Sequence, residues 1–147
     1  MEIEIEKIFP DSILPERKTS GSVGYDLFSY CPNGIEIEKG KVSFIPTGIK
    51  IAIPNGYDGE IRPRSGLSTK ERLIIPNSPG TIDSDYRGEI LVAILNLSET
   101  NFLVSHKMRI AQLIIRKSYV IDWIEVSSLS SSTERGEKGF GSTGLKN

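Results

Sequence analysis

The sequence predicts an all-β protein, because short strand patterns and closely spaced turns dominate it. Polar and apolar residues alternate strictly over residues 2–6 and 35–38, as they do in strands with one buried face. Turn signals recur at Pro32-Asn33-Gly34, Pro54-Asn55-Gly56 and Asp58-Gly59, at the spacing expected for a sandwich or barrel of short strands. The rest of the chain adds further strands and one brief helical signal.

The other elements follow in chain order. A strand is expected over residues 42–53, with a break at Pro46-Thr47-Gly48. Residues 73–75 and 90–95 are apolar β-type segments joined by a polar turn rich in Asp and Gly, which indicates a β-hairpin. Two more strands are expected over residues 109–116 and 119–126. Ser68-Thr69-Lys70-Glu71 has a capping-box pattern that would open a helix of one or two turns.

The composition indicates one compact domain followed by a polar tail. The chain has 147 residues, of which 37% are hydrophobic and 25% charged. We expect a β core over residues 1–126, a Ser-rich linker over 127–133 and a C-terminal tail over 134–147. Such a tail is either a disordered terminus or, because Phe140 stands among glycines and hydroxyl residues, a segment that binds an anionic ligand.

Charge and residue counts exclude several classes of function. The net charge of −1 leaves no global basic field, so we expect no nucleic-acid partner. Cys31 is the only cysteine and His106 the only histidine, which excludes an intrachain disulfide, a Cys-based zinc site and a His-based triad within one chain. No apolar run is long enough to span a membrane, so we expect a cytoplasmic protein without a membrane partner.

The segment from Arg62 to Gly66 is a candidate anion site. Arg62, Arg64, Ser65 and Gly66 combine two guanidinium groups, a hydroxyl and free backbone N–H groups just before the predicted helix, which suits phosphate oxygens. Pro63 limits ladder pairing, so the segment should lie at a sheet edge or rim. For Arg62, a solvated strand end is an equally reasonable interpretation.

Four further polar residues have open roles. Asp26 stands in an apolar strand and needs a cation or a hydrogen-bond donor, since an unpaired buried carboxylate is costly. Gln112 stands in a buried-type strand, where its amide could either satisfy backbone groups or contact a ligand oxygen. Asp83 and Asp85, taken alone, are ordinary turn carboxylates.

Taken together, these segments resemble the five ordered motifs of the trimeric dUTP pyrophosphatases, the dUTPase family. Five motifs in the family's order make a chance match very improbable, although each motif alone is weak. The chain departs from the family at Lys107, where the family often has a glycine, and at the charged pair Glu137-Lys138. The matching segments are residues 23–27, 62–67, 80–88, 109–113 and 135–144.

The resemblance implies an enzyme that hydrolyses dUTP to dUMP and pyrophosphate with Mg²⁺. This activity would limit uracil in DNA and supply dUMP for dTMP synthesis. It also implies a distorted β-barrel or jelly-roll-like subunit in a homotrimer, with active sites shared between subunits. The alternatives are a dCTP deaminase or bifunctional deaminase and diphosphatase of the same fold, and, from another class, a non-catalytic nucleotide-binding module.

The resemblance also implies roles for individual residues. Asp83 would be the base that activates water, Tyr86 would pack beneath the deoxyribose, and Asp26 would reach Mg²⁺ through water. Uracil would be recognised by the hairpin residues Asn77, Gly80, Thr81, Ile82 and Leu91. The phosphates would be held by Arg64, Ser65, Gly66 and Gln112, and the tail would close over the site with Arg135, Phe140, Gly141, Ser142 and Thr143.

Overall fold

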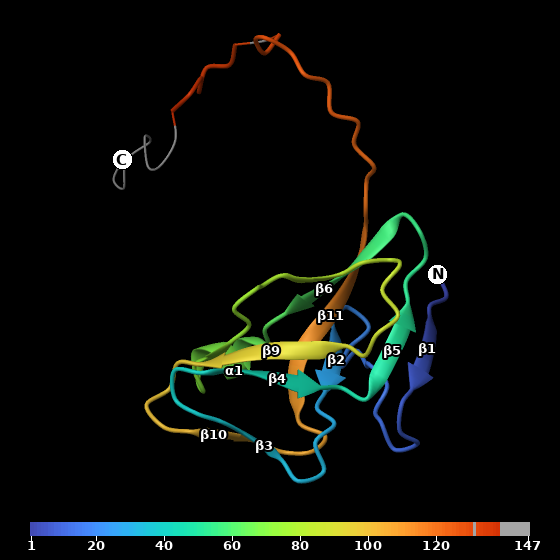
Figure 1. The fold of residues 1–147 in the computed structure, drawn as a ribbon, viewed down its shortest axis with the longest axis vertical. Coiled ribbons are helices and arrows are strands. Elements are labelled where there is room, and N and C mark those ends of the chain that lie inside the picture. The colour runs from blue at the N-terminus through green and yellow to red at the C-terminus, as the bar shows by residue number, and fades with distance from the viewer. Residues whose placement is uncertain (131, 139–147) are drawn as a thin grey trace.

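The computed structural model describes residues 1–130 and 132–138, and within them the regular secondary structure consists almost entirely of short strands (Figure 1). The all-β prediction is confirmed. In chain order the elements are β1 (Glu4–Lys7), β2 (Tyr25–Phe28), β3 (Ile35–Ile37), β4 (Val42–Pro46), β5 (Ile49–Ala52), β6 (Tyr57–Arg62), α1 (Ser65–Thr69), β7 (Leu73–Ile74), β8 (Gly80–Ile82), β9 (Leu91–Asn96), β10 (Phe102–Val104) and β11 (Arg109–Lys117).

The strands pair antiparallel in four small sheets. The largest has the order β2-β11-β6-β8, and a three-stranded sheet has the order β4-β9-β7. The two remaining sheets are the pairs β1-β5 and β10-β3. Most neighbours in a sheet are far apart in the sequence, so the fold depends on contacts made over long chain separations.

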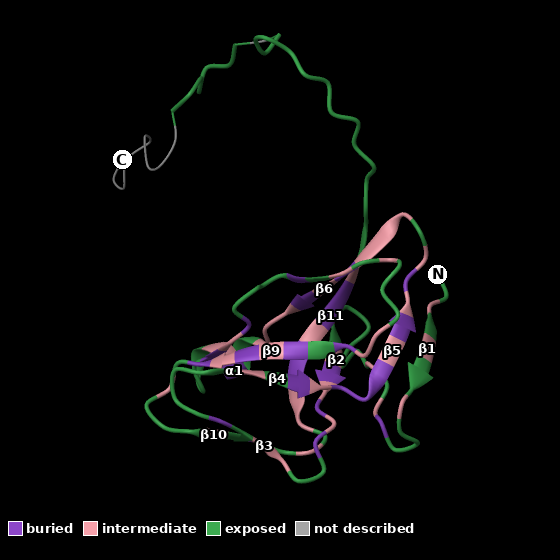
Figure 2. Ribbon diagram, viewed as in Figure 1, coloured by how far each residue is buried: buried purple, intermediate pink, exposed green. Residues whose placement is uncertain are grey.

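One apolar core lies between the sheets, where Figure 2 shows the buried stretches of β2, β5, β9 and β11. The alternating pattern places every second side chain of a strand in this core; in β9 the buried residues are Val92, Ile94 and Asn96. The buried amide of Asn96 is satisfied, because its Nδ2 donates to the carbonyls of Ile37 at 2.9 Å and Thr100 at 2.8 Å.

A β-bulge in β11 sets which side chains face the site. Arg109 lies opposite Phe28, but Ala111 lies opposite Leu27, so one extra residue is inserted between them. Ile110 and Ala111 are both buried as a result. Without the bulge, residues 109 and 112 would point to opposite faces of the strand; with it, both share a face with Asp26.

The predicted break at Pro46-Thr47-Gly48 is confirmed, because β4 ends at Pro46 and β5 begins at Ile49. The hairpin pairing is also confirmed, since Leu73 lies opposite Asn96 and Ile74 opposite Leu95. The connection is more than a turn, however. Its residues Gly80–Ile82 form β8, which pairs with β6 in the other sheet.

The helix prediction was wrong in its position. Helix α1 runs from Ser65 to Thr69 and so ends where the capping box was expected to begin. Its N-cap is Arg64, which makes no side-chain capping bond, and the buried Leu67 holds the turn against the core. Packing of one apolar side chain therefore determines this helix, not its local capping residues.

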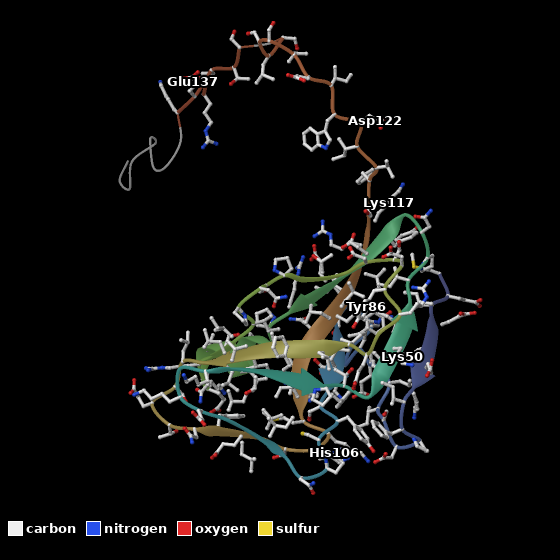
Figure 3. All side chains as sticks on the ribbon, in the orientation of Figure 1. Lys50, Tyr86, His106, Lys117, Asp122 and Glu137 are labelled. Atoms are coloured by element: carbon white, nitrogen blue, oxygen red, sulfur yellow. The ribbon has the colours of Figure 1, made fainter. Side chains whose placement is uncertain are left out.

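The strand predicted over residues 119–126 was also wrong: these residues form no strand and are exposed. The exposed fractions of Val120, Trp123 and Ile124 are 97%, 89% and 84%. The described chain beyond Lys117 extends from the end of β11 as a long arc that leaves the sheets (Figures 1 and 3). A segment rich in β-type apolar residues does not form a stable strand without a neighbouring strand to pair with.

Among the described residues, no helix is both long and apolar enough to cross a membrane.

Candidate anion-binding and active site

A pocket of about 570 Å³ opens beside the four-stranded sheet. It gathers residues from three separate motifs of the sequence, which the antiparallel register brings together: Gln112 lies opposite Asp26 on one side and opposite Arg62 on the other. The pocket is lined by Lys18, Ser22, Val23, Gly24, Asp26, Arg62, Arg64, Ser65, Gly66, Gln112 and Ile114.

Two arginines hold the carboxylate of Asp26. Arg64 donates from Nε to Oδ1 at 2.9 Å, and Arg109 donates from Nη1 to Oδ2 at 3.3 Å. The side chain of Asp26 is only 14% exposed, so its carboxylate requires charged or hydrogen-bonding partners. The two arginines are the cations that the sequence predicted for it. Arg64 also donates from Nη1 to the carbonyl of Arg109 at 3.4 Å. Its Nη2 makes no hydrogen bond to any described residue and is the group left for a ligand.

Gln112 bonds a backbone group and also faces the pocket, so both roles that the sequence allowed for its amide remain available. Its Nε2 donates to the carbonyl of Pro63 at 2.9 Å, and the side chain also lines the pocket. Its Oε1 lies against Gly24, where an added Cβ would stand only 2.1 Å away. Gly24 is therefore required because the amide of Gln112 occupies the space that a side chain would take.

Ser65 and Gly66 form the first turn of α1 and are exposed. The preceding strand β6 lies between β11 and β8, so the segment does not follow an edge strand; of the two expected positions, a sheet edge or a rim, it takes the rim. Pro63 is accommodated because β6 ends one residue earlier, at Arg62. The pocket rim is thus built by the end of a central strand and the start of a short helix.

The charges of the site favour an anion. Arg64 and Arg109 share the single carboxylate of Asp26. Arg62 and Arg116 likewise share Glu60, with Arg62 Nε at 2.9 Å and Arg116 Nη1 at 3.6 Å. Among the described residues each pair of arginines has one carboxylate partner, so positive charge is left over beside the pocket. A polyanion with several oxygens matches this arrangement better than a neutral ligand does.

The hairpin residues lie on the neighbouring edge of the same sheet. Gly80 pairs with Ile61 and Thr81 with Glu60, which places β8 at the sheet edge. Asn77 lies over Gly80, because a Cβ at Gly80 would stand 3.1 Å from the Nδ2 atom of Asn77. Backbone and amide groups are thus close together at the point where the family resemblance expects the base of the nucleotide.

Asp83 and Tyr86 follow β8 and are both exposed. Neither residue lines the pocket, and neither does Leu91, which is 48% exposed at the start of β9. The structure of one chain therefore brings together the predicted phosphate-binding residues but leaves Asp83 outside their pocket.

The tail residue Arg135 lies beyond Lys117 in the sequence, and its Nε donates to the carbonyl of Lys138 at 2.9 Å. It does not line the pocket. Phe140, Gly141, Ser142 and Thr143 lie outside the described residues.

The described residues do not form a metal centre by themselves. They contain no group of three or more His, Cys, Asp or Glu side chains placed to hold a metal ion. The pocket offers the single carboxylate of Asp26, and both of its oxygens already accept bonds from arginines. A Mg²⁺ ion bound here would have to take most of its oxygen ligands from water and phosphate, which is common for this ion.

Sequence reasoning missed Arg109 and Glu60 as parts of the site. Arg109 reaches Asp26 only because of the bulge in β11, and a possible signal was the consecutive apolar pair Ile110-Ala111 directly after it. Glu60 stands between the buried residues Gly59 and Ile61 in β6, and this pattern shows only that its side chain points away from the core. Its two arginine partners come from the strand register and not from any local pattern.

The sheets and the arginine-rich pocket thus define an all-β protein with a candidate binding site for a polyanion. Residues 11–144 match the dUTPase family, and the chain belongs to this family. It is 51% identical to the deoxyuridine 5'-triphosphate nucleotidohydrolase of Leptospira interrogans, over 98% of this chain and 99% of that protein. It is 46% identical to the enzyme of the same name from Orientia tsutsugamushi, over 99% of this chain and 100% of that protein.

The fold is shared with solved dUTPase structures. The dUTPase of Staphylococcus bacteriophage 80alpha, solved with dUPNHPP, superimposes with a TM-score of 0.86 at 29% sequence identity. The similarity covers 98% of this chain and 99% of that one.

Proposed function

We propose that this chain is a dUTP diphosphatase, which hydrolyses dUTP to dUMP and pyrophosphate. The observation that carries the proposal is the pocket in which Asp26, Arg64 and Gln112, from three different strands or strand ends, meet beside unneutralised positive charge. The names of the relatives and the dUTP analogue in the phage enzyme support the same substrate. The chain would thereby lower dUTP, limit uracil in DNA and supply dUMP for dTMP synthesis.

The phosphate chain would lie against the arginine-rich pocket. Arg64 would bind phosphate oxygens through its remaining N–H groups, and Ser65 and Gly66 would donate from a hydroxyl and from backbone N–H groups at the start of α1. Gln112 is held by Pro63, so it would present its amide without a further loss of side-chain freedom. Binding the β and γ phosphates in this way fixes the α phosphorus for attack.

Asp83 would act as the general base. Its carboxylate would accept a proton from a water molecule as the water oxygen attacks the α phosphorus. The bond from that phosphorus to the bridging oxygen breaks, and pyrophosphate leaves. A positioned carboxylate suffices because hydrogen-bond donors and cations that bind the phosphate oxygens would make the phosphorus more electrophilic. When bound, Mg²⁺ would neutralise phosphate charge, with Asp26 the candidate to contact it through water.

Selectivity would come from the hairpin. Backbone groups of Gly80, Thr81 and Ile82, with the Asn77 amide and the strand at Leu91, would match the hydrogen-bonding edge of uracil. Fixed donors and acceptors discriminate strongly, because a cytosine would leave buried polar groups unpaired. The ring of Tyr86 would occupy the space that a 2′-hydroxyl needs.

The complete enzyme would be a homotrimer with shared sites, in which each subunit is a distorted, jelly-roll-like barrel. Two features support assembly: Asp83 lies outside its own chain's phosphate pocket, and residues 119–126 expose several large apolar side chains. The tail over residues 134–147, with Arg135, Phe140, Gly141, Ser142 and Thr143, would reach a neighbouring site across the 127–133 linker. The domain bounds and a cytoplasmic location remain predictions, and the described strands end at Lys117, short of the expected core boundary at residue 126.

A direct assay tests the function. The purified chain is incubated with Mg²⁺ and, separately, with dUTP, dCTP, dTTP and UTP, and the nucleotide product, pyrophosphate and ammonia are measured. We expect dUMP and pyrophosphate from dUTP, with much slower turnover of the other three nucleotides. Ammonia released from dCTP would instead identify a deaminase, and binding of dUTP without any product would identify a non-catalytic binding module.

A further inference from the structure

A set of hydrogen bonds ties the segment after Tyr86 to the break between β4 and β5. Thr47 is 1% exposed, and its Oγ1 donates to the carbonyl of Ile90 at 2.7 Å. The backbone N–H of Ile90 in turn donates to the carbonyl of Ile49 at 3.0 Å. Between these two bonds, the carboxylate of Glu89 accepts the backbone N–H of Gly48 at 2.8 Å through Oε1. Residues 89 and 90 are therefore held by three bonds to residues 47–49.

The receiving segment is itself rigidly placed. Gly48 has a φ of +70°, and a Cβ there would stand 2.4 Å from the Oγ of Ser12 and 3.0 Å from the Tyr30 ring. Its carbonyl accepts the backbone N–H of Ile8 at 2.8 Å. A backbone N–H fixed by such close neighbours is a firm anchor for a carboxylate.

The same glutamate also contacts Tyr86, through its main chain. The hydroxyl of Tyr86 donates to the carbonyl of Glu89 at 2.9 Å, and the ring lies so close to Gly88 that a Cβ there would stand 2.3 Å from the hydroxyl oxygen. Tyr86 is 42% exposed, so packing covers only part of its side chain. The position of the ring depends on a carbonyl whose residue is anchored by its own side chain.

We propose that Glu89 is a positioning residue for sugar selectivity. Its carboxylate holds the residue on Gly48, its carbonyl holds the hydroxyl of Tyr86, and the ring is thereby kept where a 2′-hydroxyl would need space. This inference rests on the proposed function, in which Tyr86 packs beneath the deoxyribose. Loss of the carboxylate should let the ring move and admit UTP, while the chemistry at the phosphates continues.

The test compares Glu89→Ala with Glu89→Gln, whose amide oxygen can accept the same bond from Gly48. The measured quantity is the ratio of kcat/KM for UTP to that for dUTP. We expect Glu89→Ala to raise this ratio by about two- to tenfold, the range that one lost hydrogen bond supplies, and Glu89→Gln to stay near the wild-type ratio. Tyr86→Ala sets the upper limit of the change.

A second readout does not depend on activity. Amide hydrogen exchange at Gly48 should be faster in Glu89→Ala than in the wild type and unchanged in Glu89→Gln. Equal exchange, or a nucleotide ratio that stays constant in Glu89→Ala while Tyr86→Ala changes it, would overturn the proposal. A ratio unchanged even in Tyr86→Ala would overturn it too. Failure of the proposed function looks different, because the wild-type chain itself would then not hydrolyse dUTP.

Discussion

At the scale of single residues, the site depends on polar groups that are already bound to each other before any ligand arrives. Arg64 is aligned by Asp26, and Gln112 by the carbonyl of Pro63. Held side chains lose little freedom when a phosphate binds, so more of the interaction energy is available for binding. The carboxylate proposed as the base is not held in the pocket in this way: Asp83 is exposed and lies in the turn after β8.

Replacement of Asp83 by Asn should remove most of the turnover. The amide has nearly the same shape but cannot take a proton from water, and loss of a positioned general base costs about 10²–10⁴ in kcat. Asp85→Asn, which changes a carboxylate in the same exposed turn, is the matched control and should retain wild-type kcat. Both variants should bind a dUTP analogue as the wild type does in calorimetry. Near-normal turnover by Asp83→Asn would assign the base to another group.

Gly24→Ala should disrupt the pocket through Gln112. The new Cβ would stand 2.1 Å from Oε1, so the amide must swing away and release the carbonyl of Pro63. We expect kcat/KM for dUTP to fall by about 10- to 100-fold, as it does when a binding group is misplaced by about 1 Å. Gly21 lies in the same loop, and a Cβ added there would have nothing within 4 Å. Gly21→Ala should therefore keep the wild-type kcat/KM for dUTP. Equal kinetics of the two variants would contradict this account of Gly24.

At the scale of elements, three loops meet around Asp11. Its carboxylate accepts bonds from Lys107 Nζ at 3.1 Å and from the hydroxyl of Tyr30 at 2.9 Å, and His106 Nε2 lies 3.6 Å away. Lys107 has a φ of +61°, so the turn keeps the left-handed conformation that glycine favours at this family position. The turn leads through Met108 into Arg109, and the cluster thus supports the strand that delivers Arg109 to Asp26.

This cluster predicts a pH-dependent contribution to stability. The hydrogen bond from Lys107, followed by that from Tyr30, lowers the pKa of Asp11 from 3.8 to about 2. A lowered folded-state pKa means that the contribution is complete above about pH 4 and is lost as the pH falls through 2. Asp11→Asn should therefore lower Tm by a few degrees at pH 7, with the difference from wild type shrinking below pH 4. Asp85→Asn should show no such trend in the same thermal melts.

Elements with a strong local pattern could be predicted from the sequence. The alternating residues 35–38 contain β3, and the break at Pro46-Thr47-Gly48 separates β4 from β5. Elements that depend on distant partners could not. The position of helix α1 depends on the burial of Leu67, and the apolar residues of 119–126 pair with no strand in the described part of the chain. The site shows the same division: the motifs identified Arg64 and Gln112, whereas the contact between Arg109 and Asp26 depends on a bulge in strand register.

At the scale of the whole molecule, the chain alone looks incomplete as an enzyme. Its arginine-rich pocket lacks Asp83, and the described chain beyond Lys117 leads away from the sheets (Figure 1). The apolar side chains of residues 119–126 would be covered in an assembly, which would remove a large exposed surface from water. Sedimentation with and without a dUTP analogue should therefore show a species about three times the mass of the chain, 16.3 kDa.

The tail provides the sharpest test of shared sites. The seven residues 127–133 have a typical reach of about 15 Å and a stretched limit near 25 Å, enough to bridge to a neighbouring subunit. Two inactive proteins are prepared: Asp83→Asn with its tail, and a chain with Asp83 that ends at Thr133. In a cyclic trimer, every mixed ring has one junction where an intact Asp83 meets an intact tail from the appropriate neighbour. Equal mixing with random reassembly should restore roughly a quarter of the wild-type sites. If each tail instead serves the Asp83 of its own chain, no junction is complete and the mixture stays inactive, although subunit exchange, followed separately by mass-tagged chains, proceeds.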